Sequence, residues 1–385
     1  MTKNDYRQER DGGSKRVAAV VRALASAGFD VETIGVRPFA SSAARATGIG
    51  SFWRAVPAVL RVFQSTIRTL SLSVLKWFSM VAIRQMVDIT HQRQSKPTWV
   101  VVEFSQLATY RNALQCAVVL DMHNLEFELL DNYAASESRP LQRLAAMYEA
   151  RSMRRLESRV GREFDVISVV SSHDRALLDR WTDTAESHAT LVTAPNGVSE
   201  GSFAYEGGRR DTVVFVAHLG WRPNVDAAVW LAREVWPLVR IRKPTLRLQI
   251  IGRSPSPEVL KLVADDIAVI PDVESTVPFV GAARVATAPL HAAGGTRIKI
   301  LEALAAGTPV VATSLGALGL DGLDPEALVI VDDPAKFAEQ LVEMAGNEPD
   351  RSHLRDIMGP YRWDTTLSPL IDALVAKSTT ERSVA

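Results

Sequence analysis

The stretch that decides the fold is AGGTRIKILEALAAGTPVV, residues 293–311, in which a glycine pair, a helical pattern and a strand follow one another. Thr296 is a suitable N-cap, Gly307 suits the position just after the last helical turn, and Pro309 prevents continuation of the helix. The apolar run RVATAPL (284–290) precedes the glycines. Strand, glycine loop, helix and strand form the repeating unit of a parallel sheet covered by helices.

Two charged residues, Lys299 and Glu302, stand on this otherwise apolar helix. The unpaired N–H groups and the positive dipole end at the start of a helix form an anion site, in which phosphate is the usual guest. Cations at Arg297 and Lys299 work against that dipole unless an anion is present. A second interpretation stays open, because residues three apart are neighbours and can form an exposed ion pair.

Short β-branched runs alternate with helical patterns along most of the chain, which predicts an α/β protein with doubly wound parallel sheets. The expected strands are 31–36, 98–104, 116–121, 166–170, 212–218, 247–252, 268–270, 284–290, 309–313 and 327–331. They fall into two sets separated near residues 194–211, which are rich in Gly and Ser. We expect two Rossmann-like domains, 1–195 and 196–360, facing across a cleft, with the helix 361–378 packing back on the first.

The first domain lacks an apolar strand before its glycine turn, because residues 1–10 read MTKNDYRQER. Residues 11–36 then read as a glycine loop with Gly12 and Gly13, a helix and a second strand. Either the sheet lacks its first strand or the start of the chain has been lost or misassigned, and we favour the second explanation. The two glycines would let the backbone approach a ligand without interference from a Cβ atom.

Composition excludes several classes of protein. The 385 residues exceed one ordinary core, and 44 basic side chains balance 44 acidic ones, so no global charge points to nucleic acid. A single cysteine cannot form an intramolecular disulfide, which fits a reducing cytosol. The N-terminus has no secretory signal, and the longest apolar stretch, 69–83, is too short to span a bilayer. We therefore expect a cytoplasmic protein.

The run GGTRIKILEALAAGTPVV (294–311) resembles the nucleotide-sugar motif of GT-B glycosyltransferases, particularly glycosyltransferase family 4, the glycosyl transferases group 1. Other stretches are similar to the same family and occur in the right order: DGGSKR (11–16), VLDMHNLEFELL (119–130), PNGV (195–198), FVAHLGWRPNVDAAVWLAREVWP (215–237) and LQIIGRSPSPEVLKL (248–262). The resemblance covers most of the chain and implies a GT-B fold.

The resemblance implies a grip on the nucleotide-sugar donor at the start of the helix after the glycines. Lys299, with Arg222 or Arg297, would neutralise the donor diphosphate as the glycosidic bond breaks. Glu302 would accept hydrogen bonds from the ribose. Phosphate and sugar would also meet the backbone groups of the loop, which belong to Gly294, Gly295 and Thr296.

The sequence departs from the family pattern at two places. The family often has two glutamates eight positions apart, but the position eight before Glu302 is Gly294, which leaves the identity of the sugar open. His218 and Leu219 stand where Gly-Arg-type residues are common, and Arg222 can replace that charge.

His123 follows the predicted strand 116–121, where an α/β sheet places active groups. The resemblance implies that His123 contacts the donor sugar. The alternative is a histidine that caps the helix beginning at LEFELLDNYA. The glycine turn of Gly12 and Gly13 would approach the donor or the acceptor.

The sequence contains no DxD motif, no HExxH motif and no Cys/His cluster with metal-ligand spacing. We therefore expect no metal site and no cofactor apart from the nucleotide-sugar substrate, of which a UDP-sugar is favoured. The resemblance implies a retaining reaction by front-face displacement, in which the departing phosphate helps to deprotonate the acceptor. No side-chain nucleophile follows from it.

A segment without acidic residues, between Glu32 and Asp88, contains seven basic ones. Five of these recur at intervals of 7, 7, 8 and 8 residues, which would place them along one stripe of one or two helices: Arg54, Arg61, Arg68, Lys76 and Arg84. Such a stretch predicts that residues 54–84 contact the anionic inner face of a membrane, which suits a lipid-linked acceptor. The alternative is two ordinary core-packing helices with solvated arginines.

The leading hypothesis is a retaining, metal-independent, hexosyltransferase-type glycosyltransferase that moves a sugar from a UDP- or GDP-sugar to a glycan or lipid-linked acceptor in polysaccharide or glycoconjugate biosynthesis. One alternative is a catalytically degenerate GT-B protein that acts as a binding or assembly partner, supported by the missing strand and the missing glutamate. Another is a GT-B nucleotide-sugar epimerase, which needs acid/base carboxylates beside the sugar and would convert free donor without an acceptor.

Overall fold

The computed structural model describes residues 1–3, 11–38, 49–93, 98–181, 187–292, 294–320, 322–347 and 350–384, without side-chain placement for 49–54 and 379–384. The chain divides into two compact units, one formed by Met1–Pro195 with Leu367–Ala385 and the other by Asn196–Thr366. Each unit has its own sheet, and every strand pairing within the two sheets is parallel. The predicted α/β fold with parallel sheets is confirmed.

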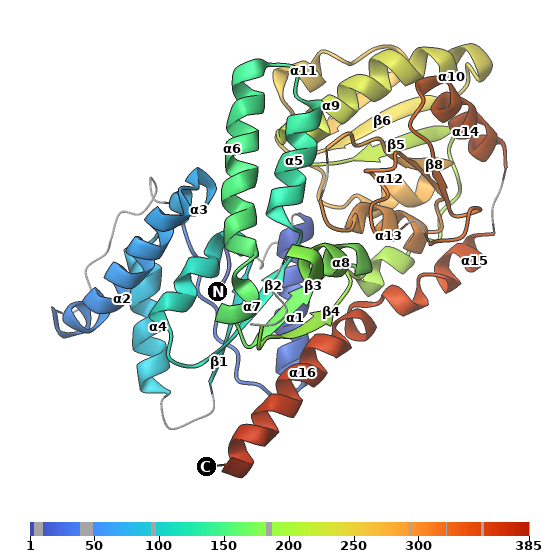
Figure 1. Ribbon diagram of the computed structural model, residues 1–385. Helices are drawn as coiled ribbons and strands as arrows, with labels where there is room; N and C mark the ends of the chain where they lie inside the picture. Colours follow the sequence, from blue (N-terminus) through green and yellow to red (C-terminus); the bar gives the residue numbers. More distant parts are fainter. Residues whose placement is uncertain are drawn as a thin grey trace. The chain divides into compact units, whose positions relative to one another are not determined.

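The first unit contains a sheet in the order β1-β2-β3-β4 (Figure 1). Its strands are β1 (Trp99–Glu103), β2 (Ala117–Met122), β3 (Val166–Val169) and β4 (Thr190–Thr193). The first three confirm predicted strands. The sequence prediction misses β4, since its run TLVT is short and half-exposed and has only two apolar side chains.

The predicted strand at 31–36 is wrong. In this segment Gly35 forms only an isolated bridge, with Thr2. On the other side, the backbone N–H of Glu103 in β1 donates to the carbonyl oxygen of Met1 at 2.9 Å. Met1 and Thr2 therefore lie beside β1, in the place that a first strand of this sheet would take. In the described part of the chain no longer strand precedes β1.

Helices and short helical turns surround this sheet: α1 (Gly12–Ser26), α2 (Ile49–Thr69), α3 (Leu72–Lys76), α4 (Met80–Gln92), η3 (Ser105–Ala113), α5 (Glu126–Ser136), α6 (Pro140–Glu157), α7 (Val160–Glu163) and α8 (Ser172–Trp181). Alternation along β2 sets the two faces of the sheet. Val118, Leu120 and Met122 join an apolar cluster with α2, α4, η3 and α6. Asp121 bonds Arg16 of α1 instead. In Figure 1, α5 and α6 pack side by side.

The basic stretch 54–84 occupies three helices, so the prediction of one continuous stripe is wrong. Arg61 and Arg68 lie seven residues apart on α2, and hence on one face of it. Lys76 ends α3 and Arg84 lies in α4, because the chain breaks at Leu70, which has φ +54°. The side chain of Arg54 lies outside the described residues.

The second unit contains a sheet in the order β10-β9-β8-β5-β6-β7. Its strands are β5 (Thr212–Val216), β6 (Arg247–Gly252), β7 (Ile267–Pro271), β8 (Val285–Ala288), β9 (Val310–Ala312) and β10 (Leu328–Ile330), each at a predicted position. Counted within the unit, this is the strand order of the dinucleotide-binding Rossmann fold. The order reverses between β5 and β8, and ligands of such sheets bind beyond the carboxyl ends of the strands at that reversal.

Helices cover both faces of this second sheet: η4 (Glu200–Phe203), α9 (Arg222–Trp230), the π-helical η5 (Leu231–Val235), α10 (Trp236–Arg242), α11 (Pro257–Leu260), α12 (Val277–Ala282), α13 (Ile298–Ala305), α14 (Pro334–Gly346), α15 (Arg351–Asp356) and η6 (Gly359–Tyr361). Val213 and Phe215 of β5 pack with α9, α10 and α14. Val214, between them, packs with α13 on the other face. Two apolar clusters therefore enclose one sheet.

The last helix, α16 (Trp363–Val384), starts in the second unit and continues in the first from Leu367. In the second unit it packs so closely on Gly197 that a Cβ atom there would lie 2.9 Å from the Cα atom of Trp363. In the first unit, Lys377 Nζ donates to the carbonyl oxygen of Asp165 at 3.0 Å. No helix in the described ranges is both long and apolar enough to cross a bilayer.

Substitution of Gly252 tests how closely the chain after β5 approaches the end of β6. A Cβ atom on Gly252 would lie 1.6 Å from the carbonyl oxygen of Ala217, so the backbone would have to move. We expect Gly252→Ala to lower the free energy of unfolding by about 1–3 kcal/mol in urea titrations. Gly346→Ala is the matched control, since a Cβ atom there meets nothing within 4 Å. Equal stability of the two variants would contradict this packing.

Candidate functional site

The glycine loop and α13 follow β8, at the carboxyl end of the strand next to the reversal point. Gly295 has φ +65° and Gly307 has φ +77°, conformations that favour glycine, so the chain turns sharply just before and just after the helix. The predicted N-cap is wrong: Arg297 occupies that position, with no side-chain cap bond. Backbone N–H groups in the first turn of α13 therefore have no side-chain acceptor from the N-cap residue.

Two polar side chains fix the shape of the glycine loop. The guanidinium of Arg297 donates to the carbonyl oxygens of Gly294 and Gly295, so this side chain folds back on the loop. Asn196, which is buried, donates from Nδ2 to Thr296 Oγ1 at 2.9 Å and to the Thr296 carbonyl oxygen at 3.3 Å. Sequence reasoning noted Asn196 only as part of PNGV. A polar side chain among apolar neighbours was the one sequence feature that could have indicated its role.

Lys299 extends from the first turn of α13 to the reversal point of the sheet. Its Nζ atom lies 5.0 Å from the ring centroid of Phe215 in β5 and donates to Asn224 Oδ1 of α9 at 3.4 Å. Asn224 in turn donates to the carbonyl oxygen of His218, in the loop after β5, at 3.0 Å. Burial, and then the Arg297 charge, lower the pKa of Lys299 to about 7. The sequence analysis did not identify Asn224, which connects Lys299 of α13 to the loop after β5.

Glu302 interacts electrostatically with Lys299, whereas Arg222 is bound by two other carboxylates. Glu302 lies one turn further along α13 and is half-buried, and its carboxylate opposes the fall in the pKa of Lys299. Arg222, at the start of α9, donates from Nε to Asp226 Oδ2 at 3.1 Å and from Nη1 to Glu258 Oε2 at 2.8 Å. The structure thus brings Lys299, Glu302 and the glycine loop together, and it gives Arg222 two carboxylate partners.

A buried charge cluster lies at the carboxyl ends of β1 and β2 in the first unit. Arg16 of α1 binds Asp121 at two points, with Nε 2.8 Å from Oδ2 and Nη2 2.7 Å from Oδ1. Its Nη1 donates to the carbonyl oxygen of Ala194 at 2.9 Å. Burial alone would raise the pKa of Asp121, but the Arg16 guanidinium holds it below the ordinary value. This ion pair fixes α1 on the sheet.

His123 belongs to the same cluster. Its Nε2 lies 2.7 Å from Glu103 Oε2, and its ring stacks on Phe104 with 3.7 Å between centroids. Burial and the neighbouring Asp121 carboxylate raise the pKa of Glu103. His123 is only 9% exposed, so Glu103 holds the imidazole in one orientation. Sequence reasoning identified His123 and overlooked Glu103, whose place at the end of an apolar strand was the signal.

One ligand atom each from Glu103, Asp121 and His123 lie within 4.8 Å of one another, the only such metal-compatible cluster in the described ranges. The donors already have other partners, because Glu103 bonds His123 directly and the Arg16 guanidinium binds both oxygens of Asp121. The Arg16 guanidinium therefore already binds the Asp121 carboxylate that a metal cation would need as a ligand. The geometry favours a proton-holding cluster over a metal centre.

The alternative role for His123, as a helix cap, is wrong. The backbone N–H groups of Glu126 and Phe127 at the start of α5 donate to the two carboxylate oxygens of Glu157, at 3.0 and 3.1 Å. Burial raises the pKa of Glu157 to about 8. Next to His123, the buried Nδ2 atom of Asn124 has no hydrogen-bond partner in the described part of the chain.

Gly12 and Gly13 form the first turn of α1 rather than a loop before it. Both are exposed. The side chain of Asp11 accepts from the backbone N–H of Ser14 at 2.8 Å, so a carboxylate already caps this helix. An anion at the same end would have to meet that negative charge.

Comparison with known proteins is clearest for the second unit. Residues 210–347 match the sequence model of the family Glycosyl transferases group 1. A D-inositol 3-phosphate glycosyltransferase of Acidothermus cellulolyticus is 28% identical over 55% of this chain and 56% of its own length. A GDP-mannose-dependent alpha-(1-6)-phosphatidylinositol monomannoside mannosyltransferase of Mycobacterium tuberculosis is 28% identical over 56% of this chain and 63% of its own length. The matches thus span little more than half of each relative.

Solved structures extend the likeness of fold to both units. Sucrose-phosphate synthase from Thermosynechococcus elongatus superposes with a TM-score of 0.61 at 15% identity, covering 97% of this chain and 94% of its own. WaaG, a glycosyltransferase involved in lipopolysaccharide biosynthesis, gives a TM-score of 0.59 at 13% identity over 95% of this chain and 96% of its own. At these identities the likeness establishes the fold, which is GT-B.

Lys299 makes stability depend on pH. Because its pKa is about 7 in the folded chain and 10.5 otherwise, the unfolded chain holds one more proton between these values. The free energy of unfolding therefore gains a term that rises with pH there, by at most about 1.4 kcal/mol per pH unit. We expect a shallower rise between pH 7.5 and 9.5 in Lys299→Met, measured by urea unfolding. The exposed Lys336→Met is the control, and equal slopes in wild type and Lys299→Met would contradict the burial of this ammonium.

Proposed function

We propose, from the match of residues 210–347 to the sequence model of the glycosyl transferases group 1 family, that this protein is a glycosyltransferase using a nucleotide-diphosphate sugar. The observation that carries the proposal is the position of Lys299. Its ammonium lies over the ring of Phe215, near the carboxyl end of β5, and bonds Asn224 of α9; sheets of this strand order bind ligands beyond the carboxyl ends of the strands at the reversal point. A diphosphate there would meet one cation and the N-terminal end of a helix.

The proposed binding mode assigns one part of the donor to each group. The diphosphate lies against Lys299 and the backbone of the glycine loop, which Arg297 and Asn196 hold in shape. Glu302 accepts hydrogen bonds from the ribose. Arg222 is the least supported member of the predicted set, because Asp226 and Glu258 bind its guanidinium.

In the proposed reaction an acceptor hydroxyl forms a bond to the anomeric carbon as the bond to the diphosphate oxygen breaks. The proton of the hydroxyl passes to the departing phosphate, and configuration is retained without a metal. Lys299 stabilises the charge that develops on the leaving group. Glu103 acts as a positioning residue for His123, for which we keep the proposed role of a sugar contact. Gly12 and Gly13, next to the N-cap of α1, are proposed to approach the donor or the acceptor.

The acceptor we propose is a phosphorylated polyol or a lipid-linked glycan. The names of two relatives contain an inositol 3-phosphate and a phosphatidylinositol monomannoside. The sugar and base stay open between UDP- and GDP-sugars, since Gly294 stands where the family often has a glutamate.

A donor screen tests the function. We expect one class of UDP- or GDP-sugar to raise the melting temperature, corresponding to about 2.7 kcal/mol at 100 times its Kd. Lys299→Ala should abolish this shift and lower nucleotide release at least a hundredfold, the loss typical of one donor to a transition-state oxyanion. Lys336→Ala, an exposed lysine on α14, is the control. Binding without turnover would instead favour the degenerate binding protein, and conversion of free donor without an acceptor the epimerase.

The surface of α2 and α3 supports peripheral contact with an anionic membrane. Leu60, Phe63 and Ile67 are 53%, 41% and 48% exposed on one face of α2, and Leu72 of α3 is 70% exposed. The exposed cations Arg61, Arg68 and Lys76 flank these side chains. Apolar side chains beside cations match the chemistry of an anionic lipid surface.

Liposome co-sedimentation tests this contact. With vesicles of phosphatidylcholine and phosphatidylglycerol, we expect Arg68→Glu combined with Lys76→Glu to weaken binding at least tenfold, since each cation near the surface contributes about 1 kcal/mol. Arg242→Glu, on the exposed end of α10 in the second unit, should leave binding unchanged. If the double variant binds as well as wild type, this surface does not face the membrane.

A further inference from the structure

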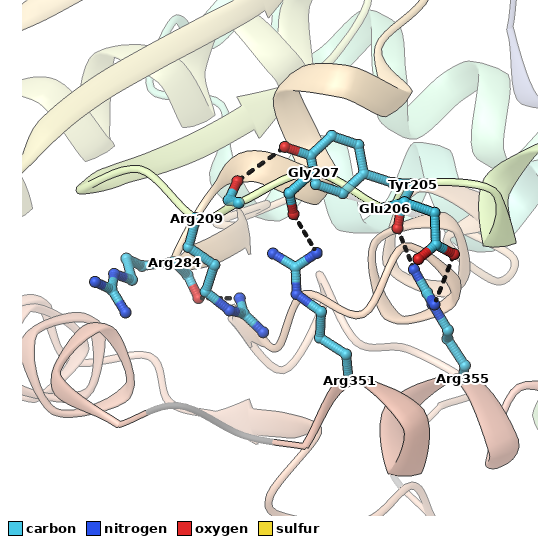
Figure 2. Close-up of a pocket in the computed structure, with 8 residues that line it drawn as sticks. Tyr205, Glu206, Gly207, Arg209, Arg284, Arg351 and Arg355 are labelled. Atoms are coloured by element: carbon cyan, nitrogen blue, oxygen red, sulfur yellow. Dashed lines mark hydrogen bonds and ion pairs between the residues drawn. The ribbon is translucent and has the colours of Figure 1, made fainter.

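A concave site, which we call the arginine pocket, lies in the second unit (Figure 2). The loop 205–208 and four arginines line it: Arg209, Arg284, Arg351 and Arg355. Its volume is about 510 Å³, within the range of small-molecule sites. In Figure 2, Arg351 and Arg355 rise from one helix, α15, toward the loop.

The arginine pocket is separate from the proposed donor site. Arg284 stands directly before β8, and Arg209 donates from Nη2 to the carbonyl oxygen of Gly307 at 2.8 Å, just before β9. The pocket thus lies at the amino ends of the strands, whereas the glycine loop lies beyond their carboxyl ends. Strands of this length separate the two sites by more than about 10 Å.

Backbone carbonyl oxygens bind the guanidinium groups of Arg351 and Arg355. Arg351 donates to the carbonyl oxygens of Gly207 at 3.0 Å and Gly281 at 3.1 Å, and Arg355 donates to that of Tyr205. Bonds to carbonyl oxygens fix a guanidinium without cancelling its charge. The pocket is therefore rigid before any ligand arrives, which lowers the entropic cost of binding.

Positive charge exceeds negative charge in the arginine pocket. Glu206 is the one carboxylate among its lining residues; it lies 3.6 Å from Arg355, and its side chain is 85% exposed. Asp211 lies 3.1 Å from Arg284. The buried Nε atom of Arg355 has no hydrogen-bond partner in the described part of the chain, although a buried donor without a partner costs about 1–3 kcal/mol.

We propose that the arginine pocket binds a phosphate ester. Guanidinium groups present planar, paired donors that match phosphate oxygens, and several in one place favour a dianion over a carboxylate. Arginine and glycine in the lining, with a single aromatic ring from Tyr205, suit a hydrophilic ligand body. The source is either a soluble phosphorylated metabolite or the headgroup of an acidic lipid.

Calorimetric titration of the full chain with inorganic pyrophosphate tests the proposal. Arg351→Gln and Arg355→Gln should each weaken binding at the pocket at least tenfold, and Lys299→Ala should leave this binding unchanged. Glu206→Gln should tighten it several-fold, because it removes the carboxylate beside Arg355 from an exposed position. Arg242→Gln removes an exposed arginine outside the pocket and should change nothing.

The outcomes separate this site from the proposed donor site. Pyrophosphate binding lost in Lys299→Ala but retained in both arginine variants would overturn the proposal while leaving the donor site intact. Should the arginine variants unfold, Glu206→Gln decides, since unchanged affinity in that variant also overturns it. Binding of Arg351→Gln to vesicles of equimolar phosphatidylcholine and phosphatidic acid identifies the source: a tenfold loss indicates a lipid headgroup, and wild-type binding indicates a soluble phosphate.

Discussion

The ammonium of Lys299 is the constraint on which the second unit depends. It lies over the ring of Phe215 and within 3.4 Å of Asn224, where burial lowers its pKa to about 7. A cation in this place is unfavourable until an anion joins it. The strand order reverses between β5 and β8 at this point, and ligands of such sheets bind beyond the carboxyl ends of the strands there. The glycines, the bond from Asn196 and the folded-back Arg297 all shape the backbone of the loop beside Lys299.

The first unit satisfies its buried charges internally. Arg16 and Asp121 neutralise each other, and Glu103 and His123 share a hydrogen bond beside them. Burial and the Asp121 carboxylate raise the pKa of Glu103, and His123 is its hydrogen-bond partner. The two units therefore differ in kind. The first holds its imidazole by a carboxylate partner, whereas the Lys299 ammonium of the second has Asn224 as its hydrogen-bond partner and is proposed to bind the donor diphosphate.

Most of the fold could be predicted from the sequence because parallel strands buried on both faces leave a plain signal. Nine of the ten expected runs are strands. The predicted strand 31–36 does not form, because its residues only bridge Thr2. An alternating sequence pattern does not show whether a neighbouring strand is present to pair with. β4 was missed because an edge strand with threonines carries a weak signal. The long run 54–84 was taken for one or two helices because the breaks at residues 70 and 77–79 contain neither glycine nor proline.

The sequence predicted only those residues of the candidate site that lie close together along the chain. The glycine loop, Lys299 and Glu302 lie within one stretch, so their proximity follows from helical geometry. Asn224, Asn196 and Glu103 reach the candidate groups from distant elements, and single polar residues give no sign of such contacts. A residue can also lie in the right stretch and point elsewhere. The position of Arg297 beside the glycines predicted a contact with the diphosphate, but its guanidinium bonds the backbone of the loop. The arginine pocket combines residues from three separate segments and leaves no motif.

The measurement that tests the central claim most directly is the number of protons taken up when a nucleotide sugar binds at pH 8. Titration calorimetry in two buffers of different ionisation enthalpy gives this number. Because Lys299 has a pKa of about 7 when free and a diphosphate would raise it, binding should take up close to one proton, and Lys299→Arg should take up none. Binding to wild type without proton uptake, or equal uptake by Lys299→Arg, would show that the diphosphate does not lie against Lys299.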